Sequence, residues 1–254
     1  IIRVIMDKPK SHIEKLPSGL SFEMIFVEGG TFMMGSDSEE AYDREKPVHE
    51  VALDSFYLGK YPVTQALWKS VMGNNPSEFQ GENNPVEKVS WYDTQDFLKK
   101  LNELIRKEYR LPSEAEWEFA ARGGNQSEGY KYSGSDRLCE VGWYNENSES
   151  SHPVGEKLAN ELEIFDMSGN VFEWCQDWYR SDYYRDCFSK GIVENPKGAV
   201  LGECPVIRGG SWHSDTRECR SSCRSGHAPE DLFYLFGFRL ALSFQLTGRP
   251  DGFH

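Results

Sequence analysis

The chain lacks several features that would place it in a familiar functional class. Its 254 residues contain no CxxC pair and no run near the roughly 18 apolar residues that a membrane span requires. The longest apolar run, Leu232–Phe238, stops at Arg239. Residues 1–20 also lack the basic start and apolar centre of a signal peptide. We therefore expect no membrane-spanning segment, and no export signal is visible.

Positive charge is scarce as well. The chain has 28 Lys and Arg against 41 Asp and Glu, which gives a formal net charge of −13. Nucleic-acid binding needs clustered cations that contact phosphates, so we expect no nucleic-acid partner. A negative surface serves solubility. The acidic residues around Asp37–Glu45 predict a solvated loop to which the sequence assigns no role.

Metal-ligating patterns are sparse. Cys219 and Cys223 have a loose zinc-ligand spacing, but no second pair accompanies them, so we expect no zinc site. The six histidines are scattered and offer no facial triad for iron. Ser211, His213 and Asp215 lie too close together in the sequence to converge as a catalytic triad. The even number of cysteines permits disulfides but does not establish an oxidising compartment.

Aromatic residues and glycine are plentiful, and both indicate a compact, loop-rich domain. Aromatics make up 13% of the chain, with seven Trp and 23 Gly. Capping signals predict three helices, over Gln65–Met72 after Thr64, from Ser90 to Ile105, and after Ser113 up to Arg122. Alternation predicts strands within 26–35, 50–57 and 169–180, while 125–165 reads as long polar loops. The fold class is α+β.

Several segments together resemble the formylglycine-generating enzyme (sulfatase-modifying factor) family. They are Phe26–Ser36, Lys60–Thr64, Pro85–Trp91, Arg110–Glu118, Asp166–Trp174, Arg208–Trp212 and Gly237–Arg239. The resemblance implies a C-type-lectin-like fold of the formylglycine-generating-enzyme type, loop-rich with few helices. It divides the chain into an N-terminal extension (1–21), this domain (22–242) and a C-terminal tail (243–254).

The chain departs from the family at one of the two catalytic cysteines, and this argues against copper-dependent oxidation. Catalytic members carry two cysteines, five positions apart, shortly after the RGGS segment, and these hold copper and oxidise a substrate cysteine. The corresponding positions here are Ser214 and Cys219. A copper(I) site needs thiolates, and a serine oxygen is a poor substitute. We therefore expect no copper, no catalytic residues and no enzymatic activity; a copper-dependent formylglycine-generating oxidase, or a related enzyme of the fold, is the alternative.

The same resemblance implies a structural calcium ion. In the family's calcium loop, a side-chain oxygen, two backbone carbonyls and a carboxylate surround the ion. Those positions correspond here to Asp166, Gly169, Val171 and Glu173. The donors suit a hard cation, which takes six to eight oxygens. The competing interpretation is that Asp166 is a turn residue and Glu173 pairs with an arginine.

A second resemblance concerns residues 206–241. Variable proteins of diversity-generating retroelements use this fold and end in a segment bounded by RGGSW and GFR, in which template adenines are randomised. Randomised asparagine codons cannot yield Glu, Lys, Gln, Met or Trp. From His213 to Phe236 only Glu218 and Glu230 fall outside the accessible set. Aromatic residues among small polar ones are also typical of binding surfaces.

We therefore predict a noncatalytic protein with a diversified ligand-binding site at about 213–236. The expected contact residues are His213, Ser214, Asp215, Arg217, Ser225, Gly226, His227, Ala228, Phe233 and Tyr234. A central buried strand at Leu232–Phe236 is the competing interpretation, and an undiversified interaction module is a further alternative. The resemblance implies an unidentified protein or cell-surface ligand, a monomeric chain, and an extracytoplasmic or cell-surface location.

Overall fold

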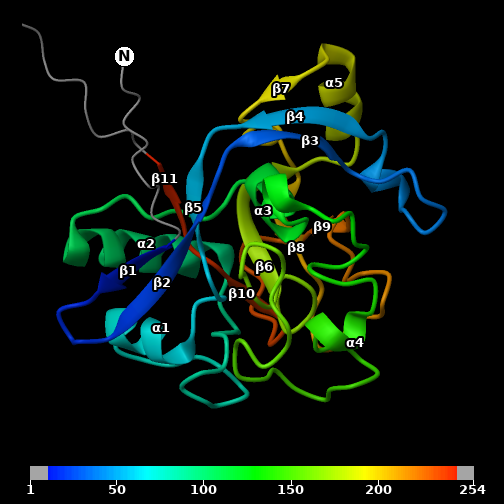
Figure 1. Ribbon diagram of the computed structural model, residues 1–254. Coiled ribbons are helices and arrows are strands. Elements are labelled where there is room, and N and C mark those ends of the chain that lie inside the picture. The colour runs from blue at the N-terminus through cyan, green and yellow to red at the C-terminus, as the bar shows by residue number, and fades with distance from the viewer. Residues whose placement is uncertain (1–10, 245–254) are drawn as a thin grey trace, which may run out of the picture.

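The computed structural model describes residues 11–244, which form three small sheets with helices packed around them (Figure 1). The first sheet has the strand order β1–β2–β5–β11, with every neighbouring pair antiparallel. Its strands are β1 (Ser11–Lys15), β2 (Ser21–Val27), β5 (Phe56–Gly59) and β11 (Ala241–Ser243). The beginning and the end of the described chain therefore meet in one sheet.

The second sheet carries the C-terminal segment. Its order is β10–β6–β8–β9, in which β10 runs parallel to β6 and the other pairs are antiparallel. The strands are β6 (Phe172–Tyr179), β8 (Cys204–Arg208), β9 (Arg224–Gly226) and β10 (Phe236–Phe238). A third sheet joins β3 (Gly30–Met34), β4 (His49–Leu53) and β7 (Val193–Glu194).

The three helices that the capping signals predict are present. They are α1 (Gln65–Met72), α2 (Trp91–Ile105) and α3 (Glu114–Ala121). Thr64, Ser90 and Ser113 each accept a backbone N–H at the helix start, which satisfies a donor that would otherwise lack a partner. Shorter helical pieces are η1 (Asp43–Glu45), η2 (Gly124–Gln126), α4 (Leu138–Val141) and α5 (Tyr183–Lys190).

Two sequence-based expectations need correction, and a third is completed. The strands on either side of Gly29 are present but do not pair with each other, because β2 pairs with β5 and β3 with β4. Gly29 instead allows a close approach, since a Cβ there would lie 2.4 Å from the Leu53 carbonyl oxygen. The segment expected as one strand over 50–57 is two strands in different sheets. Finally, β1 lies inside the expected extension 1–21, so the first sheet begins before residue 22.

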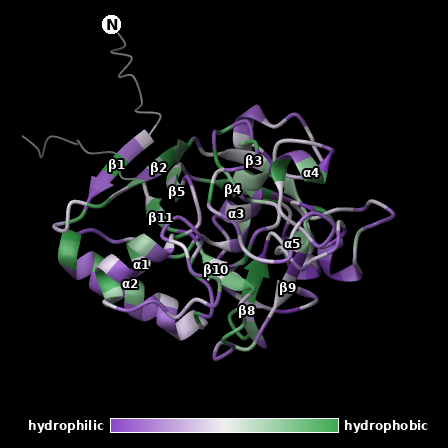
Figure 2. Cartoon of the chain, turned by 90° about the horizontal axis from the view of Figure 1, so that it is seen from below, coloured by the Kyte–Doolittle hydropathy of each residue, from purple (hydrophilic) through white to green (hydrophobic). Residues whose placement is uncertain are grey.

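Two hydrophobic clusters hold these elements together. One surrounds α3 and the strands β2, β4 and β5, with Trp117 and Phe119 fully enclosed. The other packs α1 and α2 against β10, where Trp68 stacks on Phe97 with ring centroids 5.2 Å apart. Figure 2 shows hydrophobic β8 and β10 between the α1–α2 side and the loop-rich side. The α+β, loop-rich fold expected from the resemblance is confirmed.

Candidate functional site

The segment 206–241 begins and ends on buried strands. Strand β8 leads in, β10 and β11 lead out, and each is paired in a sheet. After β8, Gly209 and Gly210 both have positive φ values, of 91° and 73°. A Cβ on Gly210 would lie 2.6 Å from the Cys219 sulfur, so only glycine fits at this turn. The frame around the segment is therefore rigid.

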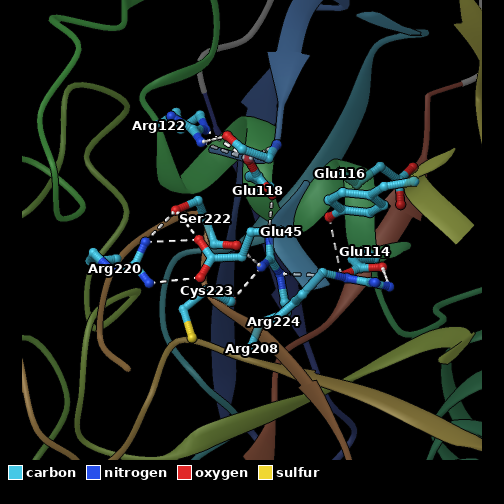
Figure 3. A network of polar contacts seen from close by, with 12 residues as sticks. Glu45, Glu114, Glu116, Glu118, Arg122, Arg208, Arg220, Ser222, Cys223 and Arg224 are labelled. Atoms are coloured by element: carbon cyan, nitrogen blue, oxygen red, sulfur yellow. Dashed lines mark hydrogen bonds and ion pairs between the residues drawn. The ribbon is translucent and has the colours of Figure 1, made fainter. Parts of the chain in front are cut away.

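The middle of the segment is anchored by buried arginines rather than being uniformly exposed (Figure 3). Arg220 forms a two-pronged ion pair with Glu45, at 2.8 and 2.7 Å. The Ser222 hydroxyl donates to the same carboxylate at 2.8 Å. Arg224 pairs with Glu114 of α3, at 2.6 and 2.8 Å. All of these side chains are buried.

Arg208 extends this network to the start of the segment. Its guanidinium pairs with Glu118 of α3 and donates to the Cys223 carbonyl and, at 2.9 Å, to the Ser222 carbonyl. Arg122 holds the other side of Glu118, at 2.8 Å. The two arginines keep the pKa of Glu118 below its usual range against the opposing effect of burial. Because removing one partner leaves an uncompensated buried charge, the network fixes the path of the loop.

The remaining part of the segment faces solvent. His213 and Asp215 are exposed, as are Phe233 at 45% and Tyr234 at 43%. Ser225, Gly226, His227, Ala228 and Arg217 are partly exposed. The central buried strand that Leu232–Phe236 suggests is absent from this stretch, because the chain becomes buried only at Phe236. Nine of the ten expected contact residues thus remain accessible.

Ser214 is the exception among the expected contact residues. It is 3% exposed, and its hydroxyl accepts the backbone N–H of Ser211 at 3.2 Å. Its carbonyl also accepts the N–H of Asn145. This burial could not be predicted from the sequence, because a serine inside a polar loop is typical of an exposed position. Ser214 is corrected to a structural position.

An accessible cleft lies on the exposed side. It measures about 220 Å³ and is lined by Ser225, His227 and Phe233 together with Arg44 and Glu218. Outside the cleft, Tyr234 stacks near Trp212 with centroids 5.9 Å apart, and both meet the edge of Phe79. The structure therefore brings the expected contact residues Ser225, His227 and Phe233 together at one cleft.

Sequence reasoning missed the contribution of the acidic loop at 37–45. Tyr42 lies between two guanidinium groups, with Arg217 3.7 Å and Arg44 4.1 Å from its ring centroid. Arg217 also donates to the Glu40 carbonyl at 2.6 Å. Cation–π contacts of this kind stabilise an exposed loop by about 0.5–1 kcal/mol each. The loop that was assigned no role therefore supports the site, and Arg217 is partly held by it.

The implied copper positions do not fit copper. The Ser214 hydroxyl accepts the backbone N–H of Ser211 at 3.2 Å, and Cys219 is fully buried. Burial raises the pKa of the Cys219 thiol well above its usual range. One hydroxyl and one thiol do not supply the pair of thiolates that copper(I) requires. Across residues 11–244, no cluster of three His, Cys, Asp or Glu side chains is arranged to hold a metal.

The expected calcium loop has its carboxylates engaged elsewhere. Glu173 is fully buried and accepts hydrogen bonds from Arg239, at 2.6 Å to each oxygen, and from Trp117 at 2.7 Å. Asp166 accepts the Gly155 N–H at 2.8 Å. In this arrangement Glu173 does not fit as a calcium ligand, because both of its oxygens face a guanidinium. Calcium itself stays a sequence-based prediction.

Comparison with known proteins decides the family. The family model described as "Sulfatase-modifying factor enzyme 1-like domain" matches residues 9–244. The chain belongs to this family. A chaperone protein LppX of Paenibacillus barcinonensis is 37% identical over 63% of this chain and 73% of its own length. A serine/threonine-protein kinase pkn1 of Chlamydia caviae is 31% identical over 90% of this chain. The chain spans only 39% of that kinase.

Enzymes and a variable protein both occur among the similar proteins. The formylglycine-generating enzyme of Streptomyces coelicolor is 29% identical over 86% of the chain. The solved structure of Treponema denticola variable protein 1 has a TM-score of 0.84 and 28% identity, and covers 93% of this chain and 100% of its own. The family assignment and the resemblance to variable proteins are thus confirmed. No helix in residues 11–244 is long and apolar enough to cross a membrane.

Proposed function

We propose that this chain is a noncatalytic ligand-binding protein in which the exposed part of residues 213–236 is a diversified contact surface. The observation that carries the proposal is the division of one loop into two sets of residues. Arg220, Ser222 and Arg224 are buried and paired with carboxylates outside the segment. The exposed residues have few such contacts, so they can change without loss of the fold.

The contact set follows from this division. It comprises His213, Asp215, Ser225, Gly226, His227, Ala228, Phe233 and Tyr234. Exposed aromatic residues among small and polar ones supply contact area at low entropic cost, as in antibody loops. The similarity to Treponema denticola variable protein 1 over nearly the whole chain supports the same function. The partner is a protein or cell-surface ligand, and the chain acts as a monomer outside the cell.

The proposal has a direct genetic test. The encoding genome should hold a near-copy of the 206–241 coding segment that differs only at adenines, beside a reverse transcriptase gene. Such a template, with substitutions at the eight contact codons and not at the Arg220 or Arg224 codons, is the expected result. A genome without any template would contradict diversification and leave an undiversified interaction module.

The absence of catalysis is tested separately. We expect the purified chain, supplied with copper(I) and a peptide containing CxPxR, to form no formylglycine, because Ser214 supplies no thiolate. Mass spectrometry of the peptide detects the aldehyde, and an active formylglycine-generating enzyme is the positive control. Turnover by this chain would contradict the noncatalytic proposal.

A further inference from the structure

The cleft beside β9 and β10 is small and mostly apolar. Its volume is about 220 Å³, and its lining includes Arg44, Glu218, Ser225, His227, Phe233 and Phe236. Sites for whole small molecules usually measure about 300–1,000 Å³. The cleft is below that range, so its size matches a single large side chain.

The floor of the cleft is built from aromatic rings set edge to face. Phe236 lies 5.3 Å from Phe233 and 6.0 Å from Phe172, at interplanar angles of 79° and 80°. The ring of His227 lies 4.8 Å from Phe236. An inserted ring would continue this arrangement, which favours aromatic over aliphatic groups. Burial raises the pKa of the Cys223 thiol, so the cleft also contains a neutral sulfur.

The cleft opens onto an exposed apolar surface. Leu232 and Tyr234 flank the cleft residue Phe233, and their exposed fractions are 55%, 43% and 45%. A ligand that filled the cleft alone would leave this surface uncovered. An anchor in a pocket, surrounded by a wider apolar contact, is the usual arrangement for a protein partner.

Acidic side chains near the cleft indicate the charge of that partner. Glu218 lines the cleft, and Asp231 pairs with the ring of the cleft residue His227 at 2.7 Å. Of the two arginines in the lining, Arg224 is neutralised by Glu114, and the Arg44 guanidinium is directed to the Arg224 carbonyl and the face of Tyr42. With a net charge of −13, the chain attracts basic surfaces at long range.

We propose that this cleft binds one aromatic side chain of a protein partner, flanked in that partner by Lys or Arg. The proposal rests on the ligand-binding function proposed above and names the chemistry of its ligand. In it Phe233 and His227 contact the inserted ring, and Glu218 contacts a flanking cation.

The test uses short peptides as probes. Acetylated, amidated Lys-Trp-Lys, Lys-Leu-Lys and Glu-Trp-Glu are titrated into the full chain, and binding is followed by NMR shifts of the Ser225, His227 and Phe233 amides. Lys-Trp-Lys should bind tightest, with an advantage over Glu-Trp-Glu that shrinks as salt is added. Equal binding of the three peptides, or shifts confined to other residues, would overturn the proposal.

Two exposed phenylalanines provide a matched pair of variants. Phe233 lines the cleft, whereas Phe188 lies on α5, is 61% exposed and lines no part of the cleft. Phe233→Ala should weaken Lys-Trp-Lys binding by roughly fivefold or more. Phe188→Ala should leave it within about twofold, since the substitution changes neither the cleft nor the surface around it. Equal losses in the two variants would contradict the assignment of the anchor pocket.

A third variant covers the case in which Phe233→Ala disturbs the fold. Ser225→Phe fills the cleft from β9 and should abolish Lys-Trp-Lys binding at an unchanged melting temperature. Retained binding by Ser225→Phe would overturn the proposal. These results are independent of the genetic test: peptide binding without a template contradicts diversification alone, and a template without peptide binding contradicts only the anchor pocket.

Discussion

At the scale of single residues, the loop's arginines separate into two kinds that look alike in the sequence. Arg220 and Arg224 are buried with carboxylate partners more than 100 positions away in the chain. Arg217 is partly exposed and bonds backbone carbonyls. Nothing in the local pattern distinguishes them, because the partners come from η1 and α3. The sequence placed Arg217 among the contact residues and assigned no role to Arg220 and Arg224, and the structure shows that these two anchor the loop.

Arg224→Ala should be strongly destabilising. The substitution leaves Glu114 buried without its bidentate partner, and breaking such a pair costs about 3–5 kcal/mol. Urea denaturation measures the change in the free energy of unfolding. The control, Arg217→Ala, removes a partly exposed arginine from the same segment and should cost under about 1 kcal/mol. Similar costs for the two variants would contradict the division of the loop.

Glu87 should make the protein less stable as the pH rises. It is fully buried, one oxygen accepts the Phe79 N–H at 2.8 Å, and the other has no partner among the described residues. Burial raises the pKa of Glu87 to about 7. Because the folded-state pKa exceeds the unfolded one, the stabilisation is complete below the unfolded pKa and is lost as pH rises through 7.

Glu87→Gln should remove that pH dependence. The amide keeps an acceptor for Phe79 and cannot ionise, so the variant should gain about 2 kcal/mol over wild type between pH 5 and pH 8. Urea denaturation at the two pH values measures the gain. Glu78→Gln, at an exposed neighbour paired with Lys88, is the control and should show no such gain. A wild type and Glu87→Gln with parallel pH profiles would contradict the assignment.

At the scale of elements, helix starts can be predicted from local sequence, whereas strand pairing cannot. Thr64, Ser90 and Ser113 cap helices as predicted, because a cap depends on residues only three positions apart. The partners of β2 and β3 could not be predicted, because register depends on strands distant in the chain. Helix α5 was also missed, since its start has no side-chain cap. The contact residues could be predicted because they lie in one continuous segment. The loop that carries Tyr42 could not, because it meets that segment only in the fold.

The loop at 166–173 offers a test at this scale. If Glu173 serves as the partner of Arg239 and Trp117 rather than as a calcium ligand, chelation should leave the melting temperature unchanged, because the guanidinium already neutralises this carboxylate. Scanning calorimetry with and without EDTA, alongside elemental analysis, measures this directly. A melting temperature several degrees lower in EDTA, with calcium found in the untreated protein, would instead support the calcium prediction and contradict this role for Glu173.

At the scale of the whole molecule, stability and contact chemistry reside in different parts of one segment. The segment is held by its strands and its buried arginines. Strands β8 and β11 pair with β6 and β5, and Arg224 bonds Glu114 of α3. The exposed aromatics and polar residues lie on the outside of that framework. A protein built in this way can vary its ligand without altering its core.

The most direct measurement of that claim compares two randomised libraries. One varies His213, Asp215, Ser225, His227, Phe233 and Tyr234, and the other varies Arg220, Ser222 and Arg224, each displayed on cells and scored by resistance to protease. We expect most members of the first library to fold and few of the second. Equal survival in the two libraries would contradict the division of the segment into a buried framework and an exposed contact surface.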